Sequence, residues 1–181
     1  MGKTLANERK YVNMADINMK PEAAKDEDLV QLVELLFFAY RDFISDPDEI
    51  LAKIGFGRAH HRVVHFVGRH PGMRVAELLG ILKITKQSLG RVLRELVERG
   101  YVEQREGASD RRQRLLFLTA RGRDLHSELL TPQIERVRRA VGNAGGGAGG
   151  IYREVLTRMI DSEGSRQLAM LHGRRVSAGS P

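Results

Sequence analysis

The sequence predicts a mainly α-helical fold with one small β-hairpin. Over most of the chain, apolar residues recur at spacings of three and four, which is the period of an amphipathic helix. Only two short stretches, Tyr101–Arg105 and Arg114–Leu118, have the composition of strands. The polar segment between them, EGASDRRQ, contains Gly107 and Asp110, which suit a turn, so these two strands should pair as a hairpin.

The N-terminal part should hold two helices behind an unstructured segment. Residues 1–25 are polar and lack a sustained apolar period, so we expect them to be disordered. A helix is predicted from Asp26 to Ile44, ended by Pro47, with a short helix at Asp48–Ile54. The first helix is apolar around so much of its circumference that it needs several partners, and a second subunit would supply one. Residues 26–57 are therefore predicted to form dimerisation helices.

The middle of the chain has the pattern of a helix-turn-helix. Helices are expected at Arg58–Arg69, Val75–Leu82 and Thr85–Arg99, the last ended by Gly100. The last helix places Leu89, Val92, Leu93 and Leu96 on one side, and Lys86, Gln87, Gly90, Arg91, Arg94 and Glu98 on the other. Together with the hairpin, these helices make residues 58–119 a winged helix-turn-helix. A half-buried helix that offers Lys, Gln and Arg to solvent suits the major groove of DNA.

The C-terminal part should return to helices. Thr119 is placed to cap a helix over 120–141. The glycine-rich segment 143–150 is predicted to be a linker or hinge, because each glycine costs a helix about 1 kcal/mol relative to alanine. Helical patterns resume at 151–160 and 163–171, so residues 120–172 are assigned to dimerisation. The tail, residues 173–181, is expected to be disordered.

Charge is concentrated in the predicted DNA-binding segment. Between Arg58 and Arg114 there are 13 Lys and Arg against 6 Asp and Glu, so this segment carries the whole net charge of +7. Clustered positive charge is typical of a surface that binds phosphates. The alternative is a structural winged helix used for protein contacts, with a basic face that is merely solvated.

Composition excludes several other classes of protein. The chain has no cysteine, which excludes disulfides, thiolate metal sites and thiol redox chemistry. No apolar run approaches the roughly 20 residues of a membrane span, and the N-terminus has no signal pattern, so a cytoplasmic protein is expected. No catalytic triad, phosphate loop or carboxylate pair stands out, so neither enzymatic activity nor a cofactor is predicted.

Residues 84–122, ITKQSLGRVLRELVERGYVEQREGASDRRQRLLFLTARG, resemble the MarR family of bacterial transcription regulators. The wing sequence DRR followed by LLFLTARG is the most specific part. The resemblance implies an obligate homodimer whose N- and C-terminal helices interlock and whose two winged motifs read a palindromic operator. It also implies a repressor, relieved when a small aromatic or anionic effector binds. Two features depart from the family pattern: the glycine run at 143–150 and Gly90 on the groove-facing side.

The first turns of the recognition helix and the wing supply the candidate DNA contacts. Gln can pair with adenine, and Arg or Lys with guanine, but the sequence leaves open which residues read bases and which bind phosphates. In the wing, arginines suit the minor groove or the backbone. The candidates are Thr85, Lys86, Gln87, Ser88, Arg91 and Arg94 on the helix, and Arg111, Arg112 and Arg114 in the wing.

Three histidines on the helix before the motif allow two further hypotheses. His61 and His65 are four residues apart and, with His60, could bind zinc or nickel in a metal-responsive switch. No third ligand type is obviously available, and such histidines more often serve packing. Alternatively, His61 and His65 could line an effector pocket together with Phe38, Tyr40 and Arg41.

Overall fold

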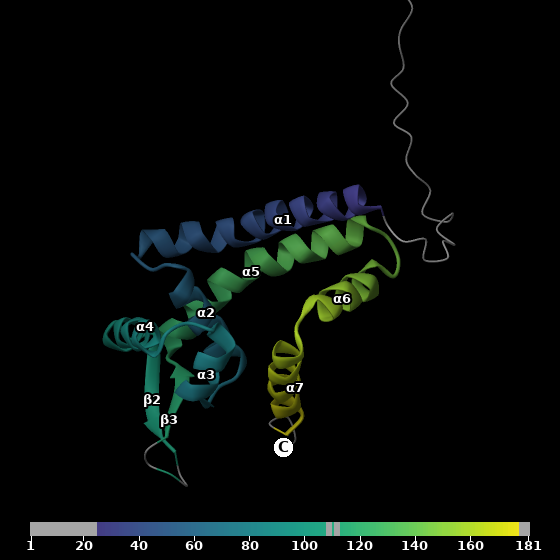
Figure 1. Ribbon diagram of the computed structural model, residues 1–181. Helices are drawn as coiled ribbons and strands as arrows, with labels where there is room; N and C mark the ends of the chain where they lie inside the picture. Colours follow the sequence, from purple (N-terminus) through teal and green to yellow (C-terminus); the bar gives the residue numbers. More distant parts are fainter. Residues whose placement is uncertain (1–24, 108–109, 111–112, 178–181) are drawn as a thin grey trace, which may run out of the picture. The chain divides into compact units, whose positions relative to one another are not determined.

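The computed structural model confirms the mainly helical fold with a small sheet (Figure 1). It describes residues 25–107, 110 and 113–177, of which 174–177 are described as backbone only. The predicted disordered segment, apart from residue 25, lies outside this range, as do residues 178–181. The elements are α1 (Asp26–Lys53), α2 (Arg58–Arg69), β1 (Met73–Arg74), α3 (Val75–Leu82), α4 (Lys86–Glu98), β2 (Val102–Glu106), β3 (Arg114–Leu118), α5 (Ala120–Asn143), α6 (Ala148–Met159) and α7 (Ser162–Ser177).

The chain divides into two units, one ending at Tyr40 and one beginning at Arg41. In the first unit, the described part of α1 carries a continuous set of exposed apolar side chains. These are Leu29, Val30, Leu32, Val33, Leu35, Leu36, Phe37, Phe38 and Tyr40, each between 43% and 71% exposed. Within the described residues, no helix is both long and apolar enough to cross a bilayer.

Helix α1 runs through Pro47, so the predicted break at this proline was wrong. Proline has no N–H, and the carbonyl of Phe43, four residues earlier, therefore loses its helical partner. The side-chain amide of Gln133 on α5 donates a hydrogen bond to this carbonyl at 3.3 Å. Asp46 also pairs with Arg136 of α5 at 2.9 Å. Contacts from a helix distant in sequence thus compensate for the missing backbone bond.

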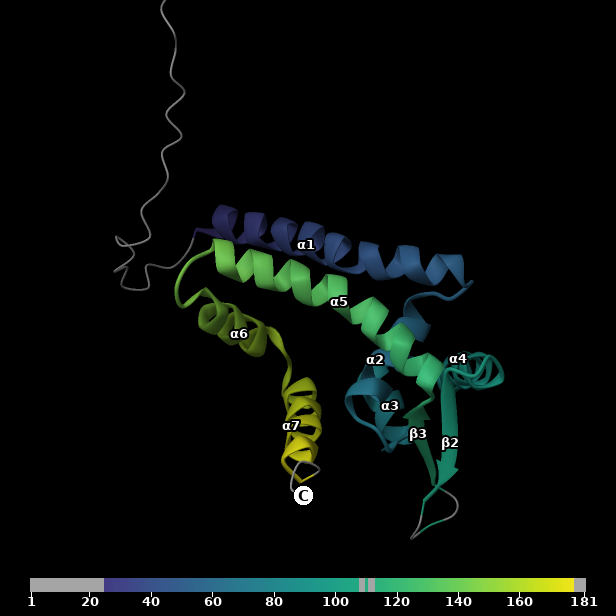
Figure 2. The same ribbon diagram turned by 180° about the vertical axis from the view of Figure 1, so that it is seen from behind.

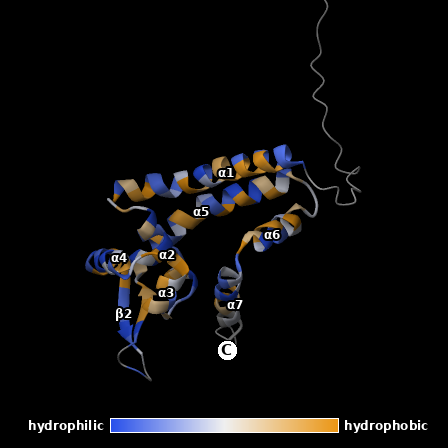
Figure 3. Ribbon diagram, viewed as in Figure 1, coloured by the Kyte–Doolittle hydropathy of each residue, from blue (hydrophilic) through white to orange (hydrophobic). Residues whose placement is uncertain are grey.

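Helices α2, α3 and α4 surround one apolar core with the sheet and the first turns of α5. Val63, Val64 and Val67 of α2 are fully buried, and the four apolar residues predicted for α4 are all buried. On α3, Leu78 and Leu82 are buried, whereas Ala76 is exposed. In Figure 3 the outer side of α4 is largely hydrophilic, so this helix separates core from solvent as predicted.

The sheet has three antiparallel strands in the order β1-β3-β2. Val102 pairs with Leu118 and Glu106 with Arg114, which forms the predicted hairpin. The short strand β1 was not predicted: Met73 pairs with Leu116 along the other edge of β3. Two residues are too few to show the alternation that marks a strand in sequence. This strand holds the start of α3 against the wing.

A junction at Thr119–Gly122 fixes the start of α5 to the end of α4. The hydroxyl of Thr119 donates to the carbonyl of Gly100 at 2.6 Å and accepts the N–H of Gly122 at 3.0 Å, so Thr119 caps the helix as expected. Gly122 packs so closely that an added Cβ would lie 2.0 Å from the carbonyl oxygen of Tyr101. Only glycine allows this approach.

The C-terminal helices are longer than predicted. Helix α5 extends to Asn143, and α6 begins at Ala148, so the predicted linker shortens to four residues, 144–147. Gly145 and Gly147 have φ of +92° and +81°, which reverses the chain within this turn. Helix α7 reaches Ser177, so the prediction of disorder was wrong over residues 173–177. Figure 2 shows α6 and α7 following one another after this turn.

We predict that Gly122→Ala lowers the free energy of unfolding by about 2–4 kcal/mol, because the methyl group would collide with the Tyr101 backbone. Chemical denaturation monitored by circular dichroism measures the change. Gly142→Ala, in the same helix with nothing within 4 Å of the added Cβ, is the matched control. It should leave stability unchanged or raise it by up to about 1 kcal/mol. Equal effects of the two substitutions would contradict the junction.

Candidate nucleic-acid interface

The start of α4 is fixed by Thr85 and Ser88. The hydroxyl of Thr85 accepts the N–H of Ser88 at 3.1 Å and donates to the hydroxyl of Ser88 at 2.9 Å. Thr85 is therefore the N-cap of the recognition helix. Both hydroxyls, proposed from the sequence as DNA contacts, take part in this cap, which sets the direction in which the first turn points.

The side chains of Lys86, Gln87, Arg91 and Arg94 are exposed on the side of α4 opposite its buried leucines. Three cations and one amide on a single helical surface can donate hydrogen bonds to base edges and phosphates. Gly90 lies among them, and a Cβ there would meet nothing within 4 Å. No packing constraint within the described protein therefore explains this glycine.

Of the three wing arginines predicted to contact DNA, Arg114 lies within the described residues. Arg114 forms an ion pair with Glu106, the residue opposite it in the hairpin, at 2.9 Å. This pair offsets part of the positive charge of Arg114. Arg111 and Arg112 lie outside the described residues. Asp110 accepts a hydrogen bond from the side-chain amide of Gln113 at 3.2 Å, which helps to shape the turn.

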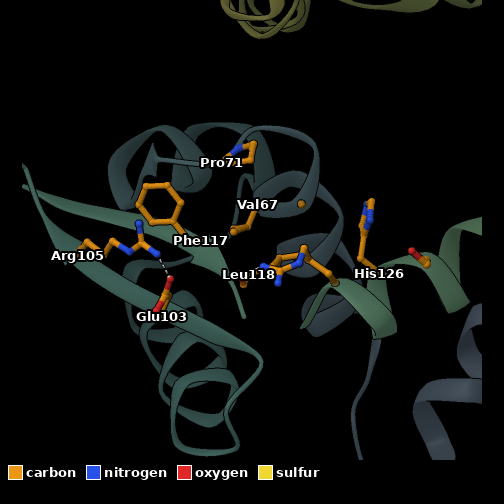
Figure 4. Close-up of a pocket in the computed structure, with 10 residues that line it drawn as sticks. Val67, Pro71, Glu103, Arg105, Phe117, Leu118 and His126 are labelled. Atoms are coloured by element: carbon orange, nitrogen blue, oxygen red, sulfur yellow. Dashed lines mark hydrogen bonds and ion pairs between the residues drawn. The ribbon is translucent and has the colours of Figure 1, made fainter. Parts of the chain in front are cut away.

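Arg105 is a wing residue that sequence reasoning missed as a candidate. Its guanidinium lies over the ring of Phe117 at 4.4 Å and forms an ion pair with Glu103 (Figure 4). These groups line a cavity of about 320 Å³ whose walls include Val67 and Leu118. Alternation along β2 could have placed Arg105 on the same face as Glu103. The stacking on Phe117 depends on the hairpin register, which sequence does not show.

His60 faces the recognition helix α4, and both of its ring nitrogens are engaged in hydrogen bonds. Its Nε2 lies 2.8 Å from a carboxylate oxygen of Glu95 on α4, and its Nδ1 accepts the N–H of Gly57 at 3.2 Å. Nε2 must then carry the proton and donate to Glu95. The ring also stacks on Phe56 at 4.4 Å. His60 thus links the start of α2 to the middle of α4.

His61 and His65 face α5, and the pKa of each is lowered there. Burial, chiefly, lowers the pKa of His65 to about 4, and the charges of His126, His61 and His70 add to this. Burial also lowers the pKa of His61 and of His126. The rings of His65 and His126 lie 5.8 Å apart. In the described part of the chain, no three His, Asp or Glu side chains are grouped as metal ligands.

The predicted effector residues His61 and His65 differ in their surroundings. His65 lines a cavity of about 390 Å³ bounded by α2, α5 and α7, whereas His61 does not line it. Arg41 forms an exposed ion pair with Asp42 at 2.9 Å. Phe38 and Tyr40 are exposed residues of the unit that ends at Tyr40. Sequence reasoning missed the other residues of this cavity: Phe66, Arg69, His70, Leu130, Ile134, Leu168, Leu171 and His172.

Comparison with known proteins decides the family. The chain is 47% identical over 146 residues to the HTH-type transcriptional regulator PetP of Rhodobacter capsulatus, covering 81% of this chain and 88% of that protein. A model of the MarR family matches residues 54–113. The chain belongs to the MarR family. This confirms the resemblance seen in the motif at 84–122, and members of the family are non-enzymatic regulators that bind DNA.

Solved structures of MarR proteins share the fold. The structure of Streptococcus pneumoniae FabT in complex with DNA has a TM-score of 0.65 at 18% identity, covering 73% of this chain and 94% of FabT. A putative MarR family regulator from Listeria monocytogenes, complexed with a 26mer DNA, has a TM-score of 0.63 at 15% identity, covering 82% and 95% of the two chains. The winged helix described above is therefore the MarR fold.

We predict that the protein loses stability as the pH falls from about 6.5 toward 4. The half-buried histidines His61, His65 and His126 have lowered pKa values, so the unfolded chain binds more protons in this window and the folded state is disfavoured. The melting temperature should fall by roughly 2–6 °C between pH 7 and pH 5. His65→Gln should reduce this fall. His172→Gln, a substitution at an exposed histidine, should not, and an unchanged pH dependence in His65→Gln would contradict the assignment.

Proposed function

We propose that the protein regulates transcription, as a repressor, by binding a palindromic operator as a homodimer. Recognition helix α4 enters the major groove and the wing contacts the flanking backbone or minor groove. The observation that carries the proposal is the exposed set of Lys86, Gln87, Arg91 and Arg94 on a helix whose opposite side is fully buried. Lys86, Gln87 and Arg91, nearest the capped N-terminus, supply contacts to base edges or to the adjacent phosphates.

The exposed apolar surfaces support the homodimer. Helix α1 exposes nine large apolar side chains between Leu29 and Tyr40, and α6 exposes Ile151, Tyr152, Val155, Leu156 and Met159 together with the adjacent Ile160. Monomeric proteins rarely leave contiguous apolar surfaces of this kind in water. A second copy of the chain would cover them, and two recognition helices would then face successive turns of one duplex.

A small aromatic or anionic effector would act through the cavity beside His65. Its volume of about 390 Å³ suits a small ligand, and its lining combines apolar Leu130 and Ile134 with Arg69 and His172. The cavity is bounded by α2 of the DNA-binding motif and by α5 and α7 of the C-terminal part. A ligand there would shift the motif relative to α5. Two observations stand against the metal-responsive alternative: His60 is engaged with Glu95, and among the described residues no three His, Asp or Glu side chains are grouped as metal ligands.

We predict a steep salt dependence of binding to duplex DNA, because each phosphate contact releases counterions. Fluorescence anisotropy at several salt concentrations measures it. Arg91→Ala and Lys86→Ala should each weaken binding by about 10-fold or more. If the lost side chain contacts a phosphate, the slope of affinity against salt should also fall by about one. Arg139→Ala removes the same charge from an exposed position on α5 and is the control. Binding that barely changes between low and moderate salt would contradict DNA binding by this surface.

We predict that Phe37→Glu shifts the protein from dimer to monomer, because a charge would be buried in the proposed interface. Sedimentation velocity measures the mass in solution. Gln31→Glu places the same residue type at another exposed position of α1 and tests whether charge alone has an effect. A wild-type protein that is monomeric at micromolar concentration would refute the homodimer.

A further inference from the structure

Lys83 occupies the turn of the helix-turn-helix in a conformation that few lysines adopt. It ends α3 with φ of +49° and ψ of 43°, the left-handed region, and is the one described non-glycine residue with positive φ. Its N–H bonds to the carbonyl of Leu79 at 3.1 Å. The side chain therefore leaves the backbone two residues before Thr85, the N-cap of the recognition helix.

Two carboxylates at the start of α7 hold the ammonium group of Lys83. Its Nζ lies 3.3 Å from Asp161 and 3.7 Å from Glu163. The hydrogen bond and the charge of Asp161 raise the pKa of Lys83. Asp161 is itself fixed, because its other carboxylate oxygen accepts the N–H of Gly164 at 2.6 Å and caps α7. Residues 78 and 80 positions apart in sequence thus meet at the turn.

Further contacts along α7 attach it to the same motif. The side-chain amide of Gln167 donates to the carbonyl of Gly80, in the last turn of α3, at 3.3 Å. Leu171 is buried in the core that α2, α3 and α4 share. The ion pairs at Lys83 are therefore one end of a docked helix, which distinguishes them from an isolated surface pair of little consequence.

We propose that Lys83 is a contact for a DNA phosphate, and that Asp161 and Glu163 of α7 compete with the DNA backbone for it. The first turn of a recognition helix enters the groove, whose edges are lined by phosphates. Lys83 lies two residues before the N-cap Thr85, so its backbone is within about 7 Å of the residue that enters between the phosphates. A lysine side chain spans that distance. Carboxylates cannot remain beside phosphates without repulsion, so binding exchanges one anion for the other. Helix α7 thereby lowers the affinity for DNA.

The inference rests on the proposed DNA binding, and charge-neutralising substitutions in the full-length chain test it. Asp161→Asn, which retains a capping oxygen, and Glu163→Gln should each tighten binding to a labelled mixed-sequence duplex of about 30 base pairs by about two- to fivefold at low salt. Glu154→Gln makes the same charge change on α6, where Glu154 pairs with Arg158, and should alter binding less. Lys83→Gln should weaken binding and abolish the gain from Glu163→Gln.

The outcomes separate the inference from the proposed function. An equal gain from Glu154→Gln, or a gain from Glu163→Gln that persists in the Lys83→Gln background, would overturn the competition. Affinities unchanged by substitution of Lys83, Asp161 or Glu163 would do the same and leave DNA binding intact. A wild-type protein that binds no duplex at any salt concentration would instead refute the proposed function. Circular dichroism of each variant shows that the fold is retained.

Discussion

The close approach of Gly122 to the carbonyl of Tyr101 is the constraint on which the arrangement of the DNA-binding motif depends. The same carbonyl accepts the N–H of Thr119 at 3.1 Å, and Thr119 also bonds to Gly100. Arg121 lies over the ring of Tyr101 and donates to the carbonyl of Arg99 at 3.1 Å. The end of α4, the start of β2 and the start of α5 therefore form one rigid junction.

This junction connects the recognition helix α4 to the C-terminal helix α5. Helix α5 continues for 24 residues from the junction, with Leu125 and Leu129 packed in the core of the motif. A change in the direction of α5 would therefore move the chain at the end of α4, since Gly122 lies directly against the backbone of Tyr101, three residues after α4. His60 and Glu95 add a second link, between α2 and the middle of α4. In a homodimer, such rigid connections would set the spacing between the two recognition helices.

Local patterns predicted the motif itself, because its features depend on neighbours in sequence. The period of apolar residues placed α4 and its buried side correctly, and Thr119 was recognised as a cap. The junction also explains why the sequence Leu118–Gly122 was informative: Thr119 supplies the capping hydroxyl and Gly122 allows the backbone contact. The fold and the exposed, basic side of α4 were thus accessible from the sequence.

Features that depend on distant residues could not be predicted. Helix α1 continues through Pro47 because Gln133, 86 residues later, supplies a hydrogen bond. The histidines of α2 look alike in sequence, yet His60 faces α4 while His65 faces α5. The role of Lys83 depends on α7, which the sequence pattern placed at 163–171 without indicating where it docks. Each case involves long-range contacts that no local period reports.

Selection of bound sequences from random duplex DNA with the purified protein tests the central claim most directly. We expect enrichment of a palindrome whose half-sites are centred about one helical turn, 10–10.5 base pairs, apart or a multiple of this. Such a result would require two symmetry-related copies of α4 on one duplex. Enrichment of a single, unrepeated half-site, or of no sequence at all, would contradict a homodimer that reads DNA through this helix.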